Sequence, residues 1–257
     1  MPNHLKELNR YGQSVWLDYI RRSLIVSGEL RRLIDEDGLC GVTSNPAIFE
    51  KAIAGSTDYE GQLKEFARRH DLDGKAAYEI LAVRDIQDVA DILRHIYDSS
   101  GKRDGYVSLE VSPDLANDTQ GTLAEARRLW GAVQRSNVMI KVPATPAGIP
   151  AIRALIGDGI NVNVTLLFHI AAYEAVAEAY ISGLEALAAR GGDPSKVESV
   201  ASFFISRIDS AIDTLIDARL KASDDAMEQA LLKGLMGRVA IANARLTYQR
   251  YKDLYLG

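Results

Sequence analysis

The sequence predicts an α/β protein that is built around a parallel sheet, and two patterns along the chain support this class. Short β-branched or apolar segments alternate with longer segments in which apolar residues recur every three or four positions. The short segments are almost continuously hydrophobic, which is typical of strands that are buried on both faces. Strands that alternate with helices form βαβ units with right-handed crossovers, so helices are expected to cover the sheet.

Six segments have the composition of such strands. They are Ser14–Tyr19, Leu39–Ser44, Tyr106–Val111, Val138–Pro143, Ile160–Leu166 and Val200–Ile205. Helical patterns fill the intervals, and residues 46–104 form a long helical insertion between the second and third strands. The residues that follow Arg207 are also expected to form helices and loops.

Two architectures fit this order of elements, an open doubly wound sheet and a (β/α)8 barrel. The length of 257 residues suits a barrel, which typically takes about 250 residues. The number of βα units does not, because six are visible where a barrel has eight. No low-complexity linker or shift in composition divides the chain, so we expect one domain over residues 1–257.

Composition excludes several classes of partner. The formal net charge of -5 gives no basic excess, so we expect no nucleic acid partner. No apolar run approaches the roughly 20 residues that span a bilayer, and the polar first residues predict no signal peptide, so we expect a cytoplasmic protein without a membrane partner. No two of the four histidines, and no histidine with Cys40, have a metal-ligand spacing, so no metal is expected. The sequence also contains no G-x-G-x-x-G or G-x-x-x-x-G-K-S/T motif, so nothing supports a dinucleotide or P-loop site.

In both architectures a ligand binds at the carboxyl ends of the strands, so polar residues in that position are the candidates for function. Along the chain they are Asp18, Thr43, Asn45, Glu110, Lys141, Asn163, Thr165, Ser202 and, just beyond the sixth strand, Arg207.

Lys141 is the most informative candidate, because charged side chains are almost never fully buried unless they are paired. A lysine among apolar strand neighbours must find a partner, point into a polar cavity or lose its proton. A neutral amine is the nucleophile that forms a Schiff base with a ketone. The alternative interpretation is a structural ion pair with Glu110 on the next strand.

The other candidates also have two interpretations each. Asp18 and Glu110 could transfer protons during carbon–carbon cleavage, or could be interior ion pairs of Lys141. Polar residues such as Asn163 could bind sugar hydroxyls or a water molecule, but strand-end polar residues often cap the next helix. Arg207 at the start of a helix suits a phosphate group, or could be a surface arginine.

Four segments together resemble the transaldolase family, most closely its longer bacterial members, some of which are fused to a glucose-6-phosphate isomerase domain. The segments are Thr43–Phe49, Val138–Thr145, Asn163–Phe168 and Ser202–Arg207. The resemblance follows the whole chain in order, and the combination is specific although no single segment is. It implies a (β/α)8 barrel of the TIM type.

The resemblance also implies a class I transferase of the pentose phosphate pathway. Lys141 would form a Schiff base with sedoheptulose 7-phosphate or fructose 6-phosphate, and a dihydroxyacetone unit would pass to erythrose 4-phosphate or glyceraldehyde 3-phosphate. By the same resemblance, Asp18 would move the proton at the cleaved bond, and Glu110 and Thr165 would hold a water molecule. Asn45 and Asn163 would hold the dihydroxyacetone unit, with Thr43 and Ser202 beside them. Arg207 would bind the phosphate group. No cofactor is implied.

Three readings of function remain open from the sequence. The first is transaldolase, and the second is a lyase that resembles fructose 6-phosphate aldolase, a family with tyrosine where this chain has Phe204. The third is an inactive, C-terminally incomplete barrel with a binding or assembly role. Because the family's last two strands are not apparent, the first and sixth strands would have free edges, and a homo-oligomer is possible.

Overall fold

The computed structural model describes residues 3–69 and 72–257, and His70 therefore lies outside the described residues. Within these ranges, six parallel strands form one sheet in the order β1-β2-β3-β4-β5-β6. The strands are β1 (Val15–Asp18), β2 (Leu39–Thr43), β3 (Val107–Glu110), β4 (Val138–Pro143), β5 (Val162–Leu167) and β6 (Ser199–Phe203). All six predicted strands are confirmed, with ends that differ by no more than a few residues.

The strand order decides between the two architectures that the sequence allowed. A doubly wound sheet reverses its order at a switch point, whereas here each strand lies beside the next one along the chain. Sequential parallel order is that of a (β/α) barrel, so the fold is of the TIM-barrel type with part of the barrel present. Among the described residues, β1 and β6 each have one strand neighbour, and the sheet does not close on itself.

Helices occupy the intervals between the strands and the C-terminal part of the chain. They are α1 (His4–Leu8), α2 (Arg22–Val26), α3 (Glu29–Asp37), α4 (Pro46–Ala54), α5 (Glu60–Phe66), α6 (Gly74–Ser99), α7 (Thr119–Val133), α8 (Gly148–Gly157), α9 (Ile170–Ala189), α10 (Ser206–Ala222), α11 (Ala226–Leu235) and α12 (Val239–Tyr255). Short 3-10 helices lie at η1 (Asn9–Tyr11), η2 (Pro113–Leu115) and η3 (Pro194–Lys196). The segment 46–104 thus contains α4, α5 and α6.

Several of these helices begin where the sequence supplies a capping side chain. Asp73, Asp118 and His169 each accept a hydrogen bond from a backbone N–H in the first turn of α6, α7 and α9. Such caps satisfy donors that the helix itself leaves free, which fixes where each helix begins after the preceding strand or loop.

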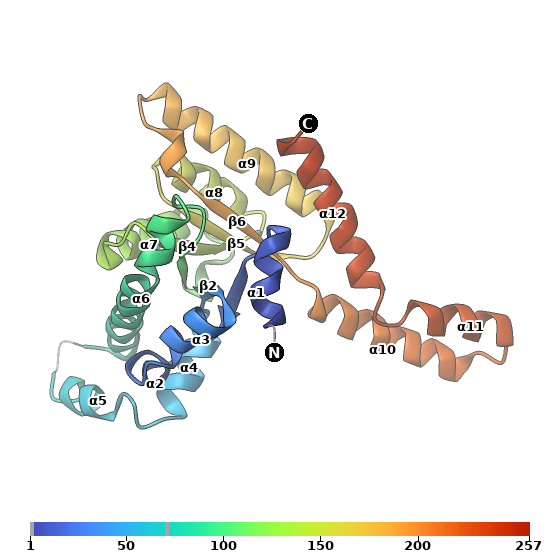
Figure 1. Ribbon diagram of the computed structural model, residues 1–257, viewed down its shortest axis with the longest axis horizontal. Helices are drawn as coiled ribbons and strands as arrows, with labels where there is room; N and C mark the ends of the chain where they lie inside the picture. Colours follow the sequence, from blue (N-terminus) through green and yellow to red (C-terminus); the bar gives the residue numbers. More distant parts are fainter. Residues whose placement is uncertain (1–2, 70–71) are drawn as a thin grey trace.

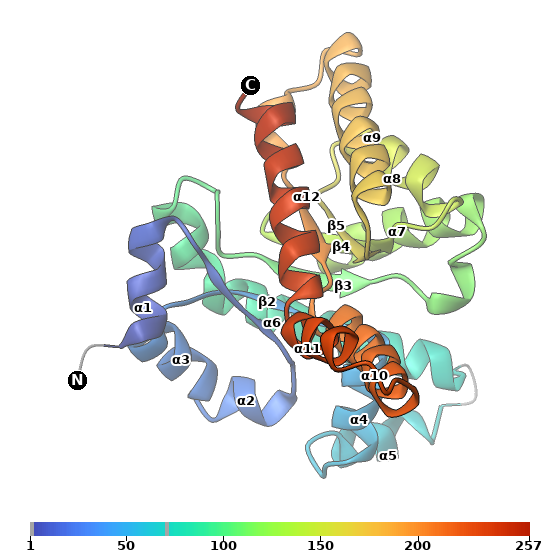
Figure 2. The ribbon, with the colours of Figure 1, turned by 90° about the vertical axis from the view of Figure 1, so that its right-hand side faces the viewer.

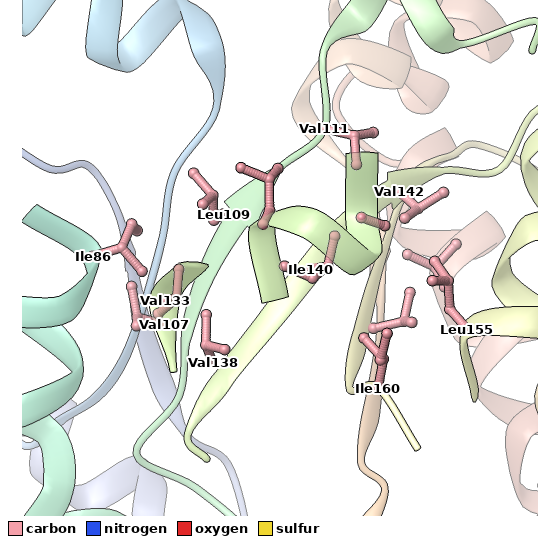
Figure 3. Close-up of a cluster of buried hydrophobic side chains, with 14 of the residues drawn as sticks. Ile86, Val107, Leu109, Val111, Val133, Val138, Ile140, Val142, Leu155 and Ile160 are labelled. Atoms are coloured by element: carbon pink, nitrogen blue, oxygen red, sulfur yellow. The ribbon is translucent and has the colours of Figure 1, made fainter. Parts of the chain in front are cut away.

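The core lies between the sheet and the helices that cover its outer face. Figure 3 shows aliphatic side chains of β3 and β4 packed with residues of the covering helices, among them Ile86 of α6 and Leu155 of α8. Every residue of β4 is buried, and β2, β3 and β5 are buried at most positions. For these central strands the prediction of burial on both faces is correct.

The same prediction was wrong for the two outer strands. The residues of β1 are half-buried or exposed, and so are those of β6. An outer strand has a neighbour on one side only, so its backbone and side chains stay partly open even where its sequence is apolar.

The C-terminal helices project from the sheet before the chain returns to it. Figure 1 shows α10 and α11 extending away from the body, and Figures 1 and 2 both show α12 beside α9. Asn243 of α12 donates a hydrogen bond to the carbonyl oxygen of Phe168 at 2.8 Å, and Arg250 pairs with Glu174 of α9 at 2.6 Å. No helix within the described ranges is long and apolar enough to span a membrane.

The amino-terminal end of the sheet carries a compact aromatic layer. Trp16 of β1 lies directly against the backbone of Gly41 in β2, and a Cβ atom built on Gly41 would be 2.4 Å from the indole ring. Tyr106 and Met139 are buried in the same cluster, with Trp16 and Val200 packed against them. This layer fills the interior at one end of the sheet, and Glu110, Lys141 and Asn163 lie nearer the carboxyl ends of their strands.

We expect Gly41→Ala to lower the free energy of unfolding by about 1–3 kcal/mol, because the indole of Trp16 must move to admit the methyl group. Urea denaturation measures this difference. Gly131→Ala is the matched control, since Gly131 lies in α7 with open space around it. That helical substitution should stabilise the chain by about 0.5–1 kcal/mol. Equal stability of the two variants would contradict the close contact with Trp16.

Candidate active site

Lys141 lies at the centre of the sheet and is almost completely enclosed. Only 6% of the residue is exposed, and apolar neighbours precede and follow it along β4. Its Nζ donates a hydrogen bond to the carbonyl oxygen of Ser44 at 3.2 Å and lies 3.4 Å from Oε2 of Glu110. The distance between Lys141 and Glu110 is that of an ion pair, as the alternative interpretation requires. A buried amine beside a carboxyl group is also the arrangement that Schiff-base chemistry uses.

The strand register explains how these groups come together. Glu110 pairs with Lys141, and Lys141 pairs with Asn163, so three polar side chains of β3, β4 and β5 lie in one row on the same face. Two strands from β3, Asp18 at the end of β1 is in register with Thr43 of β2, which pairs with Ser108 of β3. The sheet thus brings most of the predicted residues to one face at its carboxyl end.

Glu110 has a strongly asymmetric electrostatic environment. Burial raises its pKa above the ordinary value of 4.5, while the ammonium group of Lys141 opposes this shift. The carboxylate of Asp18 also raises the pKa of Glu110, and the guanidinium of Arg207 lowers it. A carboxyl group with a raised pKa keeps its proton to a higher pH than a free glutamate does, which suits a general acid or base.

A hydrogen-bond chain crosses the row from β3 to β6. The Asn163 side chain donates from Nδ2 to Oγ of Ser108 at 2.9 Å and accepts at Oδ1 from Oγ of Ser202 at 2.7 Å. Ser44 donates its hydroxyl to the carbonyl oxygen of Ser108 at 2.7 Å. These bonds fix the side-chain amide of Asn163 beside Lys141.

Sequence reasoning missed Ser44 and Ser108, which are both fully buried. Ser44 contributes the carbonyl oxygen that holds Lys141, and Ser108 orients Asn163. A signal for Ser108 existed, because it precedes Glu110 by two positions and side chains at that spacing lie on the same face of a strand. No comparable signal marked the backbone carbonyl of Ser44.

Thr165 ends the regular part of β5. Only 2% of the residue is exposed, and its carbonyl oxygen accepts a hydrogen bond from the backbone N–H of Ala144 at 2.8 Å. The next residue, Leu166, has a positive φ of 59°, at a register shift between Val164 and Leu167. A bulge of this kind redirects side chains at the end of a strand, and non-glycine residues with positive φ often lie at functional sites.

At the end of β2, the two candidates behave differently. Asn45 accepts a hydrogen bond from the backbone N–H of Ile48 at 3.0 Å, so it caps α4 as the alternative interpretation anticipated. Its amide NH2 group is a separate donor. The hydroxyl of Thr43 is buried without a hydrogen-bond partner among the described residues. A ligand hydroxyl beside Thr43 would satisfy that group.

Beyond β6, an aromatic pair supports the predicted phosphate-binding arginine. The rings of Phe168 and Phe204 are stacked with centroids 4.9 Å apart. The guanidinium of Arg207, the second residue of α10, lies 4.8 Å from the centroid of Phe204. Arg207 is exposed, as expected of a surface arginine, but the ring of Phe204 orients its guanidinium group.

Two cavities lie near the sheet, and one of them reaches the site. A cavity of about 340 Å³ is bounded by α4, α6, α7 and the end of β3, and Glu110 forms part of its lining together with Tyr78. Burial and nearby glutamates raise the pKa of Tyr78 to about 12. The larger cavity, about 650 Å³, lies between β6, α9 and α12 and is lined by none of the predicted site residues. Within the described ranges, no three His, Cys, Asp or Glu side chains gather as a metal site.

Comparison with known proteins identifies a family that the chain matches over nearly its whole length. Residues 15–256 match the family model described as Transaldolase/Fructose-6-phosphate aldolase. The chain is 51% identical over 253 residues to Transaldolase 2 of Nostoc sp., a match that covers 98% of this chain and 66% of the relative. It is 50% identical to the transaldolase of Trichodesmium erythraeum, covering 99% of this chain and 67% of that protein. The chain spans about two thirds of the length of these relatives.

We expect the stability of the chain to depend on pH through Glu110 with a definite sign. The ordinary pKa of a glutamate is 4.5, and folding raises that of Glu110. Such a group stabilises the folded chain at a pH below 4.5, and this contribution is lost as the pH rises. The free energy of unfolding of the parent chain, relative to Glu110→Gln, should therefore fall between pH 4 and pH 7, as measured by urea denaturation.

Glu29 provides a control with the opposite sign. Its hydrogen bond with Arg32 lowers its pKa below 4.5, so its contribution is present at higher pH and is lost as the pH falls. The parent chain relative to Glu29→Gln should gain stability over the same rise in pH. The same sign for both pairs would refute the assignment of a raised pKa to Glu110.

Proposed function

The chain belongs to the transaldolase and fructose-6-phosphate aldolase family, and from this premise we propose that it transfers a dihydroxyacetone unit between sugar phosphates by a Schiff-base mechanism. The observation that carries the proposal is Lys141, a buried lysine beside Glu110 in a row of polar side chains. The donor would be sedoheptulose 7-phosphate or fructose 6-phosphate, as in the pentose phosphate pathway. The acceptor would be glyceraldehyde 3-phosphate or erythrose 4-phosphate.

Imine formation begins when the neutral amine of Lys141 attacks the ketone carbon of the donor. The carbinolamine that results must lose water, and a proton has to reach the departing oxygen. Glu110 lies 3.4 Å from Nζ and has a raised pKa, so it can hold the proton that this step needs. Thr165, buried at the end of the neighbouring strand β5, would help to hold the water.

Cleavage then requires a base at the hydroxyl of the bond that breaks, and we assign this role to Asp18. When its carboxylate takes the hydroxyl proton, the carbon–carbon bond breaks, an aldose leaves and the bonding electrons move into the imine to give an enamine. The three-carbon unit stays on Lys141 until a second aldose is attacked. Each of these steps is then reversed, so one set of groups serves both halves of the reaction.

The remaining residues would bind the substrate without taking part in proton transfer or covalent bonding. Asn163, held by Ser108 and Ser202, presents its amide beside Lys141 and suits a hydroxyl of the dihydroxyacetone unit. The NH2 group of Asn45 and the unpaired hydroxyl of Thr43 would bind another hydroxyl. Arg207, at the start of α10, would bind the phosphate group through charge-assisted hydrogen bonds.

The family also includes lyases that release the three-carbon unit, and the stacked rings beside the sheet favour transfer instead. Phe204 lies against Phe168, and a phenyl ring has no group that could orient water toward the enamine. A poorly activated water leaves the intermediate available to a second aldose. Because the chain spans about two thirds of its relatives, a non-catalytic role is the outcome if no transfer and no adduct is detected.

We expect incubation with fructose 6-phosphate and borohydride to add a reduced three-carbon unit to Lys141, mapped by peptide mass spectrometry. Lys141→Arg should abolish both adduct and transfer, because a guanidinium stays charged and cannot form the imine. Lys196→Arg, a change at an exposed lysine of η3, is the matched control and should leave the adduct unchanged. An adduct on a lysine other than Lys141 would contradict the assignment.

We expect Phe204→Tyr to raise the release of free dihydroxyacetone relative to transfer, because a phenol can orient a water at the enamine. The two products are measured in the same reaction, with and without an acceptor aldose. Phe203→Tyr is the control, since Phe203 is the adjacent residue and lines the cavity beneath α12 rather than the site. An unchanged ratio in Phe204→Tyr would mean that Phe204 serves packing alone.

A further inference from the structure

Asp18 occupies a strand that the sheet holds weakly. Among the described residues β1 pairs with β2 alone, and its register is irregular between Val15 and Trp16. Asp18 itself is the last residue of β1, and its side chain is exposed. A group that transfers protons must be held to a fraction of an ångström, so interactions outside the β-ladder have to restrain this strand.

The first such restraint lies at the beginning of β1. Asp104, which is 9% exposed and precedes β3, accepts a hydrogen bond at Oδ1 from Nε1 of Trp16 at 3.0 Å. Its other oxygen accepts from the hydroxyl of Ser14. The nearly buried carboxylate of Asp104 therefore holds two residues at the beginning of β1, the end of the strand that is opposite Asp18.

The second restraint follows Asp18 directly and centres on Asp85. Asp85 of α6 is fully buried, and its Oδ1 accepts hydrogen bonds from Nε and the NH2 group of Arg22 at 2.7 Å and 2.5 Å. Tyr59, also fully buried, donates its hydroxyl to Oδ2 of Asp85 at 2.7 Å. The same hydroxyl accepts from the backbone N–H of Arg22 at 3.0 Å. Arg22 begins α2, so this network fixes the backbone shortly after Asp18.

Further contacts make the attachment of this turn rigid. The backbone N–H of Ser23 donates to Asp58 at 3.0 Å, and the guanidinium of Arg22 lies over the ring of Tyr59, 4.7 Å from its centroid. Ile20, between Asp18 and Arg22, is completely buried in the core. Residues 58, 59, 85 and 104 all belong to the helical segment 46–104, which therefore restrains β1 at both ends.

We propose that Tyr59 and Asp85 are positioning residues for Asp18, acting through Arg22. This inference rests on the proposed function, since it assigns the helical segment 46–104 a part in the cleavage step. Neither residue touches the Lys141 row, and Asp85 is enclosed by Arg22 and Tyr59. Their effect is confined to the step that Asp18 performs, and imine formation at Lys141 proceeds without them.

Borohydride trapping separates the two steps in one measurement. With fructose 6-phosphate as donor, reduction before cleavage leaves a six-carbon unit on Lys141, whereas reduction after cleavage leaves a three-carbon unit. Mass spectrometry of the Lys141 peptide gives the ratio of the two. Trapping with dihydroxyacetone reports imine formation alone, because no carbon–carbon bond has to break.

We expect Tyr59→Phe and Asp85→Asn to lower the ratio of three-carbon to six-carbon adduct by about tenfold or more, since small displacements of a catalytic group have effects of this size. Trapping of dihydroxyacetone should stay within about twofold of the parent chain, as expected when Lys141 is undisturbed. Asp91→Asn is the matched control, because Asp91 lies on the same helix α6 and pairs with Arg135 at the surface. It should change neither quantity.

A double variant tests whether the effect passes through Asp18. In an Asp18→Asn background, Tyr59→Phe should cause no further loss of cleavage, because the group that it positions has already been removed. If Tyr59→Phe lowers both adducts in proportion and leaves their ratio unchanged, the residue serves stability alone and the proposal is overturned. An additional, independent loss in the double variant would overturn it as well.

A measurement that needs no activity keeps this inference separate from the proposed function. Amide hydrogen exchange over residues 16–23 should be faster in Tyr59→Phe than in the parent chain, and unchanged in Asp91→Asn. If the folded parent chain forms no adduct on Lys141, the proposed function fails, and exchange alone then decides whether the network restrains the segment that carries Asp18. Equal exchange in all three proteins would overturn the restraint.

Discussion

The burial of an amine in the middle of an apolar strand is the constraint on which the rest of the site depends. Lys141 has apolar residues before and after it in β4, so its hydrogen-bonding partners must come from neighbouring strands. Glu110 supplies a carboxylate, and Ser44 supplies a carbonyl oxygen just beyond β2. Once these partners are in place, the face around them must be polar as well, and Ser108 and Asn163 complete a connected set of hydrogen bonds. A lysine that is held by neutral and acidic groups on separate strands cannot move without breaking several contacts, which keeps the amine fixed.

Much of the fold could be predicted because strands that are buried on both faces leave an unmistakable pattern. The segment Val138–Pro143 was predicted with its observed ends, since six consecutive enclosed positions admit few polar residues. The local pattern alone could not give the strand order, because pairing depends on contacts between distant segments and both candidate architectures share that pattern. The family resemblance did predict the order, since a TIM barrel has sequential parallel strands. The free edges of β1 and β6 were expected from the family resemblance, but the partial exposure of their side chains was not, because both sequences have the pattern of strands buried on both faces. A segment such as Val200–Ile205 is apolar because of what packs on one of its faces, and its sequence does not say that the other side has no strand neighbour.

For the site, the sequence was most informative where a residue type conflicts with its surroundings. A lysine or glutamate within an apolar strand is conspicuous, and the register brings Lys141 and Glu110 together as expected. Serine fits a buried strand without conflict, so the signal for Ser108 was limited to its position two residues before Glu110, and its hydrogen bond to Asn163 was not predicted. Asn45 shows that two interpretations of one residue can both hold, because its carbonyl oxygen caps α4 while its NH2 group remains a potential donor.

The residues at the two outer strands are held in place by different means, and this difference follows from the geometry of the open sheet. Lys141 has strands on both sides, so the ladder alone nearly determines its position. Ser202 of β6 lies on an outer strand, but its hydroxyl is tied to Asn163 at 2.7 Å and thus to the centre of the row. Asp18 of β1 is exposed and belongs to a strand whose fixed points are carboxylates at its two ends, Asp104 before it and Asp85 after it. In the role that we propose for Asp18, a base that approaches a substrate hydroxyl cannot be held through its own oxygens without losing that function. Restraint of the backbone on either side is the arrangement that leaves the carboxylate free and still keeps it in place.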